Sequence, residues 1–397
     1  MFSARLPWHI AENALAAGVQ ERRQRGDLLD LTESNPTRAA LPYPADALSA
    51  ALGRTDPARY EPAALGLPGA RAAVAAAYAA TAGTVIDPAR VAITASSSES
   101  CSFLFKLLCD PGDAILIPEP SYPLHDYLVR LEGAVPIGYR LAFDGVWSID
   151  FASIEQGLAD ARARGARPRA IVVVNPNNPT GGFLRRDEAT RLAAIAAAGG
   201  LSIIADEVFA DYAFERDPSR VQTAAIEPVL TAAARVFSLG GLSKSCGLPH
   251  LKLGWIVVGG PDADATMAGL ELIADTYLSV AAPVQQALPD LFTIGAGIRA
   301  AIAARIAANR TALARAMEGA PACTLLPSEA GWAALLRVPA TRSDEEWAAR
   351  LVSETGVLVH PGYFFDLRGG TFLVVSLLPE PALFAEAVRR MTTFLGT

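Results

Sequence analysis

The stretch SLGGLSKSCGLPHLKLGW, residues 238–255, places one lysine, Lys244, among glycines and serines. An apolar run leads into this stretch, and another, residues 254–258, follows, so the pattern predicts that Lys244 lies in a turn beside a sheet. Glycine and serine allow a flat ligand to approach the backbone closely. Burial lowers the pKa of a lysine, so that its neutral amine can form a Schiff base. An exposed loop lysine is the alternative that this stretch alone leaves open.

Polar side chains also follow the two apolar runs nearest the N-terminus. Residues 91–94 read as a strand, and Ser97 and Ser98 stand between it and a predicted helix. Hydroxyl and backbone N–H groups at a helix N-terminus form an anion site, although a plain serine cap fits the same pattern. The next run, residues 114–118, is followed by Tyr122. Open α/β sheets bind ligands at this end of their strands.

Two later strands carry the same kind of signal. The unbroken apolar run 170–174 is typical of a buried parallel strand, and the turn that follows it holds Asn178. The run 201–205 ends at Asp206. A carboxylate at the end of a buried strand is costly unless it is paired or solvated, so Asp206 is a candidate functional acid, with a structural ion pair as the alternative.

Length and composition limit the remaining possibilities. A chain of 397 residues exceeds one ordinary core, so we expect an N-terminal arm (1–45), a large domain (46–285) and a small C-terminal α/β domain (286–397). A helix is expected from Trp8 to Arg25. The net charge of −7, without a basic block, argues against nucleic acid as a partner. No apolar run reaches the ~18 residues of a membrane span. The four histidines lack metal-ligand spacing, and four scattered cysteines without a CxxC pair suit a cytoplasmic protein.

Three motifs together resemble one family. The segments 175–181 (NPNNPTG), 205–208 (ADEV) and Ser243-Lys244, in this order and spacing, resemble the fold-type I pyridoxal-phosphate enzymes, class I/II aminotransferases, over nearly the full chain. The resemblance implies an α/β fold with a mostly parallel, doubly wound sheet in the large domain and a small α/β domain. It implies pyridoxal 5′-phosphate as the cofactor and a homodimer with shared active sites. The expected reaction moves an amino group from an amino acid or related amine to a 2-oxo acid.

The resemblance also assigns roles to individual residues. Lys244 would form an aldimine with the cofactor and then carry a proton between substrate and cofactor. The phosphate would contact Ser97, Ser98, Lys252 and, across the dimer, Tyr60. The ring would stack on Tyr122, and its nitrogen would meet Asp206. Asn178 would contact both the cofactor's phenolic oxygen and the substrate carboxylate, and Ser34 would lie near that carboxylate.

The sequence departs from the family pattern at four positions. Phe209 stands where a tyrosine usually bonds the cofactor's phenolic oxygen, Lys252 replaces an arginine, and Gly241 replaces a serine. The fourth and largest change is Val374, at the place of the arginine that clamps the substrate carboxylate.

Three interpretations of Val374 are open. Arg337 or Arg368 could supply the missing cation, or the substrate could lack a free carboxylate. Alternatively, the enzyme could be a lyase or synthase on the same fold, because fold does not set the reaction.

A DNA-binding regulator that keeps the cofactor pocket is a further alternative, but the sequence offers no basic helix for it.

Overall fold

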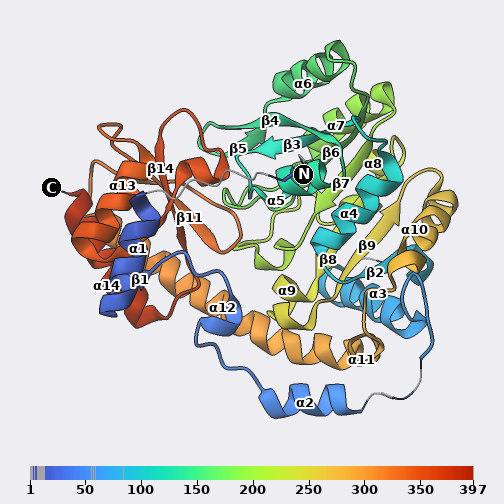
Figure 1. The fold of residues 1–397 in the computed structure, drawn as a ribbon, viewed down its shortest axis with the longest axis horizontal. Helices are drawn as coiled ribbons and strands as arrows, with labels where there is room; N and C mark the ends of the chain where they lie inside the picture. The colour runs from blue at the N-terminus through green and yellow to red at the C-terminus, as the bar shows by residue number, and fades with distance from the viewer. Residues whose placement is uncertain are drawn as a thin grey trace.

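The computed structural model describes residues 3, 5–6, 14–54, 56, 58, 60–83 and 85–396. Its centre is an eight-stranded, mostly parallel sheet (Figure 1). Strand β9 is antiparallel to both of its neighbours, and β5 is antiparallel to β4. In spatial order the strands are β2 (Val91–Thr94), β9 (Gly254–Gly259), β8 (Val236–Gly241), β7 (Ser202–Asp206), β6 (Pro168–Val174), β3 (Ala114–Glu119), β4 (Val135–Phe143) and β5 (Trp147–Ile149). The predicted doubly wound α/β fold is confirmed.

Helices cover both faces of this sheet, which explains the unbroken apolar strands. In β6, Ala170 and Val172 pack on one side, whereas Ile171 and Val173 pack on the other. Successive residues of a strand point to opposite faces, so a strand buried on both faces must be apolar throughout. One face carries α4 (Ser97–Leu108), α5 (Leu124–Leu131) and α10 (Ala263–Tyr277); the other carries α6 (Phe151–Ala163), α7 (Arg186–Gly199) and α8 (Pro228–Thr231).

A second, antiparallel sheet forms the core of the C-terminal part, on the left in Figure 1. Its strands, in spatial order, are β10 (Thr324–Leu325), β11 (Ala333–Val338), β14 (Thr371–Ser376) and β13 (His360–Pro361). Helices α13 (Asp344–Arg350) and α14 (Pro381–Leu395) and the π-helical turn η6 (Leu351–Thr355) belong to the same part. The N-terminal segment joins it, because β1 (Leu29–Asp30) pairs in parallel with β12 (Val357–Leu358).

The remaining helices link the two sheets and cover their sides. Helix α1 spans Ala14–Arg25, and the first residues of the helix predicted from Trp8 lie outside the described residues. The other helices are α2 (Ala45–Gly53), α3 (Pro68–Ala82), α9 (Leu242–Ser245) and α11 (Ala282–Gln286), with 3₁₀ turns η1 (Pro36–Arg38), η2 (Pro88–Arg90), η3 (Ala210–Tyr212), η4 (Ala224–Ile226), η5 (Pro249–Leu251) and η7 (Gly362–Phe365).

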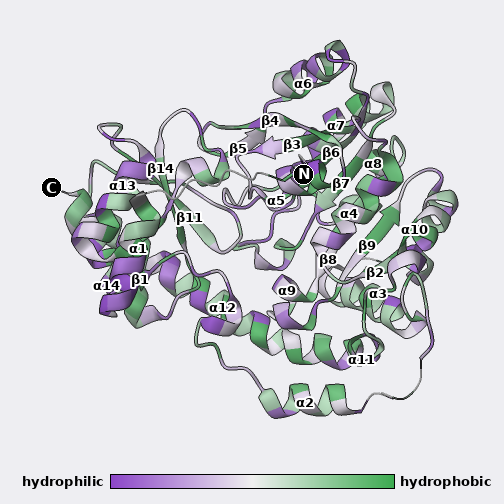
Figure 2. Cartoon of the chain, in the orientation of Figure 1, coloured by the Kyte–Doolittle hydropathy of each residue, from purple (hydrophilic) through white to green (hydrophobic). Residues whose placement is uncertain are grey.

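Helix α12 (Leu288–Met317) runs from the large sheet to the small one (Figure 1). By length and composition alone, α12 could cross a membrane, although it is not an uninterrupted apolar run. Its polar side chains bond within the fold, however: Arg305 donates to Ala39 O, and Asn309 donates to Leu377 O. These bonds tie α12 to the N-terminal segment and to the segment that follows β14. Figure 2 shows hydrophobic residues along β9, β11 and part of α12, where these elements face the core.

Candidate active site

A cavity of about 350 Å³ lies between the ends of the large-sheet strands and the small sheet. Parallel strands gather their carboxyl ends at one edge, so residues far apart in the sequence meet there. The cavity is lined by eight of the ten residues predicted for the site: Ser34, Ser97, Ser98, Tyr122, Asn178, Asp206, Lys244 and Lys252. The two departures from the family pattern at Phe209 and Val374 also line it.

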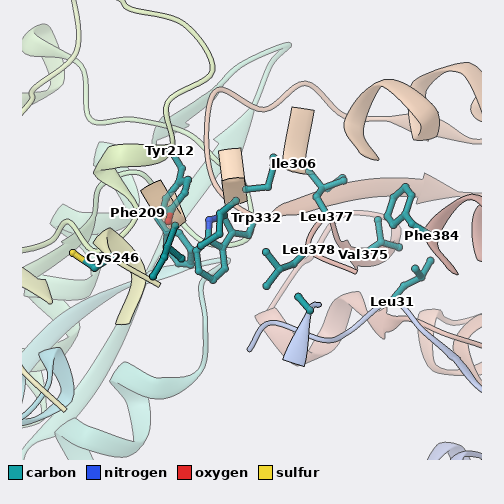
Figure 3. Close-up of a cluster of buried hydrophobic side chains, with 14 of the residues drawn as sticks. Leu31, Phe209, Tyr212, Cys246, Ile306, Trp332, Val375, Leu377, Leu378 and Phe384 are labelled. Atoms are coloured by element: carbon teal, nitrogen blue, oxygen red, sulfur yellow. The ribbon is translucent and has the colours of Figure 1, made fainter. Parts of the chain in front are cut away.

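Lys244 lies on the short helix α9, which follows β8 directly. The hydroxyl of Tyr212 donates to the backbone oxygen of Lys244 at 2.6 Å and fixes this turn. The Lys244 Nζ lies 4.8 Å from the ring centroid of Trp332 and 5.6 Å from that of Phe209. Figure 3 shows the side chains of Phe209, Tyr212 and Trp332 side by side. Burial lowers the pKa of Lys244 and so favours a neutral amine. The charge of Asp206 acts in the opposite direction, but its effect is smaller.

Asp206 ends β7 and faces a histidine that the sequence analysis did not select. Oδ2 of Asp206 lies 3.5 Å from Nε2 of His125, and both side chains are buried. Among the described residues, neither ring nitrogen of His125 has a hydrogen-bond partner. The backbone N–H of Val208 donates to Oδ1 of Asp206 at 3.2 Å. The carboxylate is therefore held by His125 and by the backbone of Val208, and Asp206 also lines the cavity.

The predicted anion site lies at the N-terminus of α4. Ser96 caps the helix, because its hydroxyl accepts from the N–H of Glu99 at 3.2 Å. The first N–H groups of a helix, here those of Ser97 and Ser98, have no partner within the helix and attract anions. At Gly254, a Cβ would lie 2.7 Å from the carbonyl carbon of Ser96, so only glycine lets β9 approach this turn. Lys252 adds a positive charge to the same cavity.

The end of the cavity near Val374 has a mixed lining. Val374 is 1% exposed and belongs to an apolar cluster with Leu335, Phe365 and Phe372. The side chains of Ser34 and Asn178 also line the cavity, and no described residue hydrogen-bonds either of them. This end can therefore accept a substrate with both apolar and polar groups.

Neither arginine expected to replace the family's clamp reaches the cavity. Arg337 is exposed, with its guanidinium carbon 5.6 Å from the Phe372 ring centroid and 5.9 Å from that of Phe143. Arg368 is paired with Glu119 at 3.1 Å, and its side chain is 72% exposed. The position of Arg337 does not support its predicted contact with substrate.

Tyr60 lies outside the cavity on this chain. Its side chain is 75% exposed and borders a separate hollow next to α11. A large exposed aromatic side chain is a typical component of an interface. Its predicted contact with the phosphate of a second subunit stays a prediction.

Several more cavity residues were not selected from the sequence, among them Trp332 just before β11, Ala333 at its start and His360 on β13. They come from the small sheet, and no local motif marks them. For His125, the available signal was its position in the first turn of α5, three residues after Tyr122, which precedes the helix.

Behind Asp206, Glu207 faces away into a second hollow of about 120 Å³. Its Oε1 accepts from the N–H of Ala224 at 2.7 Å and from the hydroxyl of Ser238 at 2.9 Å. Its Oε2 is buried and has no partner among the described residues. Burial raises the pKa of Glu207 to about 8, despite these hydrogen bonds, so this carboxyl is a structural acid that is protonated over much of the neutral range.

Comparison with known proteins agrees with this geometry. The model of the family described as aminotransferase class I and II matches residues 26–390. The valine–pyruvate aminotransferase of Mycobacterium tuberculosis is 28% identical, over 98% of this chain and 96% of that protein. The glutamate–pyruvate aminotransferase AlaA of Haemophilus influenzae is 26% identical, over 75% of this chain and 73% of that protein.

Among solved structures, the alanine aminotransferase of Pyrococcus furiosus superposes with a TM-score of 0.86 and 24% identity. The superposition covers 100% of this chain and 99% of that protein's chain. That likeness shows the fold. The family match over most of the chain shows more: the protein belongs to the class I and II aminotransferases, the pyridoxal-phosphate enzymes that transfer amino groups.

Proposed function

We propose that this aminotransferase takes its amino group from an apolar monocarboxylic amino acid, with valine as the first candidate, and gives it to pyruvate. Apolar side chains elsewhere in the cavity lining, among them Leu124, Phe365 and Trp332, carry this proposal, because they suit a branched aliphatic side chain. No arginine is among the described residues that line the cavity, so a second carboxylate, as in aspartate, finds no such partner on this chain. The name of the M. tuberculosis relative, which matches along almost the full length, supports the same pair of substrates.

The cavity residues fit pyridoxal 5′-phosphate. The N-terminus of α4 with Ser97 and Ser98, together with Lys252, would hold the phosphate. Tyr122 would lie against the ring, and Asp206 would keep the ring nitrogen protonated. When bound, the cofactor supplies an aldehyde for the amino group and an electron sink for the bond electrons released at the substrate Cα.

Lys244 carries out the proton transfer in this proposal. Its amine is buried, and burial favours the neutral form, which can both form a covalent link and accept a proton. Once the substrate has released it, the Lys244 amine would take the proton from the substrate Cα and deliver it to the cofactor's C4′. The rings of Trp332 and Phe209 exclude water around Nζ, so the proton is not lost to solvent.

His125 and Asp206 act as one unit. The imidazole of His125, with Nε2 3.5 Å from Oδ2 of Asp206, positions this carboxylate. The charge of Asp206 is needed because only a carboxylate holds a protonated ring nitrogen in place.

We also propose that the enzyme is a cytoplasmic homodimer in amino acid metabolism. The exposed ring of Tyr60 supports the dimer, as it would reach the phosphate of a second subunit. All four cysteines are free thiols, which suits a reducing compartment. Light scattering of the pure protein tests the dimer, and a monomer would remove the role given to Tyr60. Cell fractionation tests the location, and a secreted or membrane-bound enzyme would contradict it.

The substrate proposal is tested by single-turnover spectroscopy. Cofactor-loaded enzyme is mixed with valine, alanine, aspartate or glutamate, and the loss of the visible band is followed. Valine and alanine should convert the cofactor to its pyridoxamine form faster than either dicarboxylic amino acid. A clear preference for aspartate or glutamate would show that the substrate class is wrong.

A further inference from the structure

The amino donor's carboxylate needs a partner at the end of the cavity where Val374 stands. Val374 offers no hydrogen bond or charge, and its neighbours Leu335 and Phe372 are apolar as well. An unpaired carboxylate against such a wall would be costly. Asn178 and Ser34 can each give a hydrogen bond there, and a carboxylate has acceptor sites for further donors.

His360 lies directly beside Val374. Strand β13 pairs antiparallel with β14, and the register places His360 opposite Val374. Side chains of directly opposed residues point to the same face and have Cβ atoms about 4.5–5.5 Å apart. Both residues line the cavity. The imidazole therefore lies next to the position from which the family's arginine would extend.

Aromatic neighbours fix the orientation of the His360 ring and leave its nitrogens free. The ring stacks on Phe364, with centroids 5.0 Å apart and planes at 10°, and meets Phe365 nearly at right angles at 5.6 Å. Stacking occupies a face of the ring, whereas the nitrogens lie at its edge. No described residue forms a hydrogen bond with either nitrogen of His360. Neither nitrogen is fully enclosed by protein atoms.

The other basic side chains in and near the cavity have different neighbours. Lys244 and Lys252 lie with the large-sheet loops, and His125 is buried beside Asp206. Arg337 is further along β11, two residues beyond Leu335, and is exposed over Phe143 and Phe372. A carboxylate at Val374 thus meets His360 before it meets any of these side chains.

We propose that His360 holds the α-carboxylate of the amino donor, in place of the arginine that Val374 replaces, together with Asn178 and Ser34. This inference rests on the proposed function for the choice of donor. An imidazole offers a single N–H toward a carboxylate, where an arginine offers two parallel ones. The structure therefore assigns to this enzyme a carboxylate site of lower strength, built on β13 and not on β14.

The test compares a donor with the same molecule without its carboxylate. Valine and 2-methylpropan-1-amine are supplied to the wild type and to His360→Leu, and the ratio of their kcat/KM values gives the preference for the carboxylate. His360→Leu should reduce this ratio by about 30-fold or more, mainly through the KM for valine. His360→Gln, which keeps an N–H donor on a differently shaped side chain, should fall between the two. The double change His360→Leu with Val374→Arg should restore the preference.

Arg337→Leu is the matched control, since it removes the competing cation. Its ratio should stay within about twofold of the wild type. A ratio that falls with Arg337→Leu and not with His360→Leu would overturn the proposal, and so would a wild type that shows no preference for valine over the amine. His360→Leu and His360→Gln should both melt cooperatively, which separates recognition from folding.

A binding experiment keeps this test independent of turnover. Calorimetry measures the affinity of 2-methylpropanoate, which has the carboxylate but no amino group, for the cofactor-loaded enzyme. Binding to the wild type that His360→Leu weakens would support the role of His360 even if no amino acid were transaminated. Equal affinities for the wild type and His360→Leu would refute that role, whatever the reaction proves to be.

Discussion

Nε2 of His125 lies 3.5 Å from Oδ2 of Asp206, and the two buried side chains come from α5 and β7, 81 residues apart in the sequence. This pair connects a carboxylate that lines the cavity to the packing of the large domain.

Asp206→Asn should slow amino transfer by about 10³-fold, because a neutral amide no longer stabilises a protonated ring nitrogen. His125→Leu should have a smaller effect of about tenfold, because it leaves the carboxylate in place without its neighbour. Single-turnover rates with valine measure both changes. Asp217→Asn, a change to an acid paired with Arg185 outside the cavity, is the control and should keep the wild-type rate. Equal rates for Asp206→Asn and the wild type would contradict the assignment.

Lys244→Ala should abolish the covalent link and slow amino transfer by at least about 10³-fold, because both the nucleophile and the proton carrier are lost. Reduction with borohydride followed by peptide mass analysis should place the cofactor on Lys244 in the wild type. Lys106→Ala, which removes a surface lysine paired with Glu132, should be labelled at Lys244 like the wild type. Label on any other lysine would show that the site has been wrongly assigned.

Phe209→Tyr should lower the pKa of the lysine–cofactor linkage by about one unit, because a phenol at this position can donate to the cofactor's phenolic oxygen. Tyr212 does not supply that donor, since its hydroxyl is bonded to the backbone oxygen of Lys244. The measurement is the absorbance of the loaded enzyme as a function of pH. Phe209→Leu controls for the loss of ring contacts with Trp332 and should not lower the midpoint. An unchanged midpoint in Phe209→Tyr would mean that the hydroxyl does not reach the cofactor.

Glu207 should make the wild type less stable as the pH rises. Its pKa is raised by burial from 4.5 to about 8, so the folded protein keeps a proton that the unfolded chain releases. The associated stability is complete below about pH 4.5 and is lost as the pH rises toward about 8. Glu207→Gln keeps an oxygen for Ala224 and Ser238 and cannot ionise, so it should flatten this dependence.

Thermal melts at pH 6 and pH 8.5 measure this effect. The difference in Tm between Glu207→Gln and the wild type should shift by at least about 2 °C in favour of the variant between pH 6 and pH 8.5. Glu354→Gln, at an exposed acid of η6, should show no such gain. Parallel curves for the wild type and Glu207→Gln would show that Glu207 is ionised in the folded state.

The sequence predicted the fold and the floor of the cavity because both depend on local patterns. Unbroken apolar runs such as 170–174 marked strands covered on two faces, and polar residues at their ends had to meet at one sheet edge. That reasoning brought together Ser97, Asn178, Asp206 and Lys244, which all line the cavity. These residues are separated by up to 147 positions, yet each lies at the end of its own strand.

The carboxylate end of the site could not be predicted in this way. Arg337 points to the same face of the small sheet as Leu335, but it lies two residues further along the strand, about 7 Å away. Which of several cations approaches Val374 depends on the pairing of β13 with β14, and β13 is only two residues long. His125 was missed for a related reason, since only the packing of α5 brings its ring to Asp206. In both cases the deciding information is tertiary.

The most direct test of the central claim is a two-step absorbance titration of the cofactor-loaded enzyme. Valine is added first, and pyruvate follows after removal of the excess amino acid. The account predicts that valine removes the visible band of the lysine-bound cofactor, that the pyridoxamine spectrum is stable, and that pyruvate restores the original band with the release of alanine. A band that valine leaves unchanged, or that pyruvate cannot restore, would contradict amino transfer between these two substrates at Lys244.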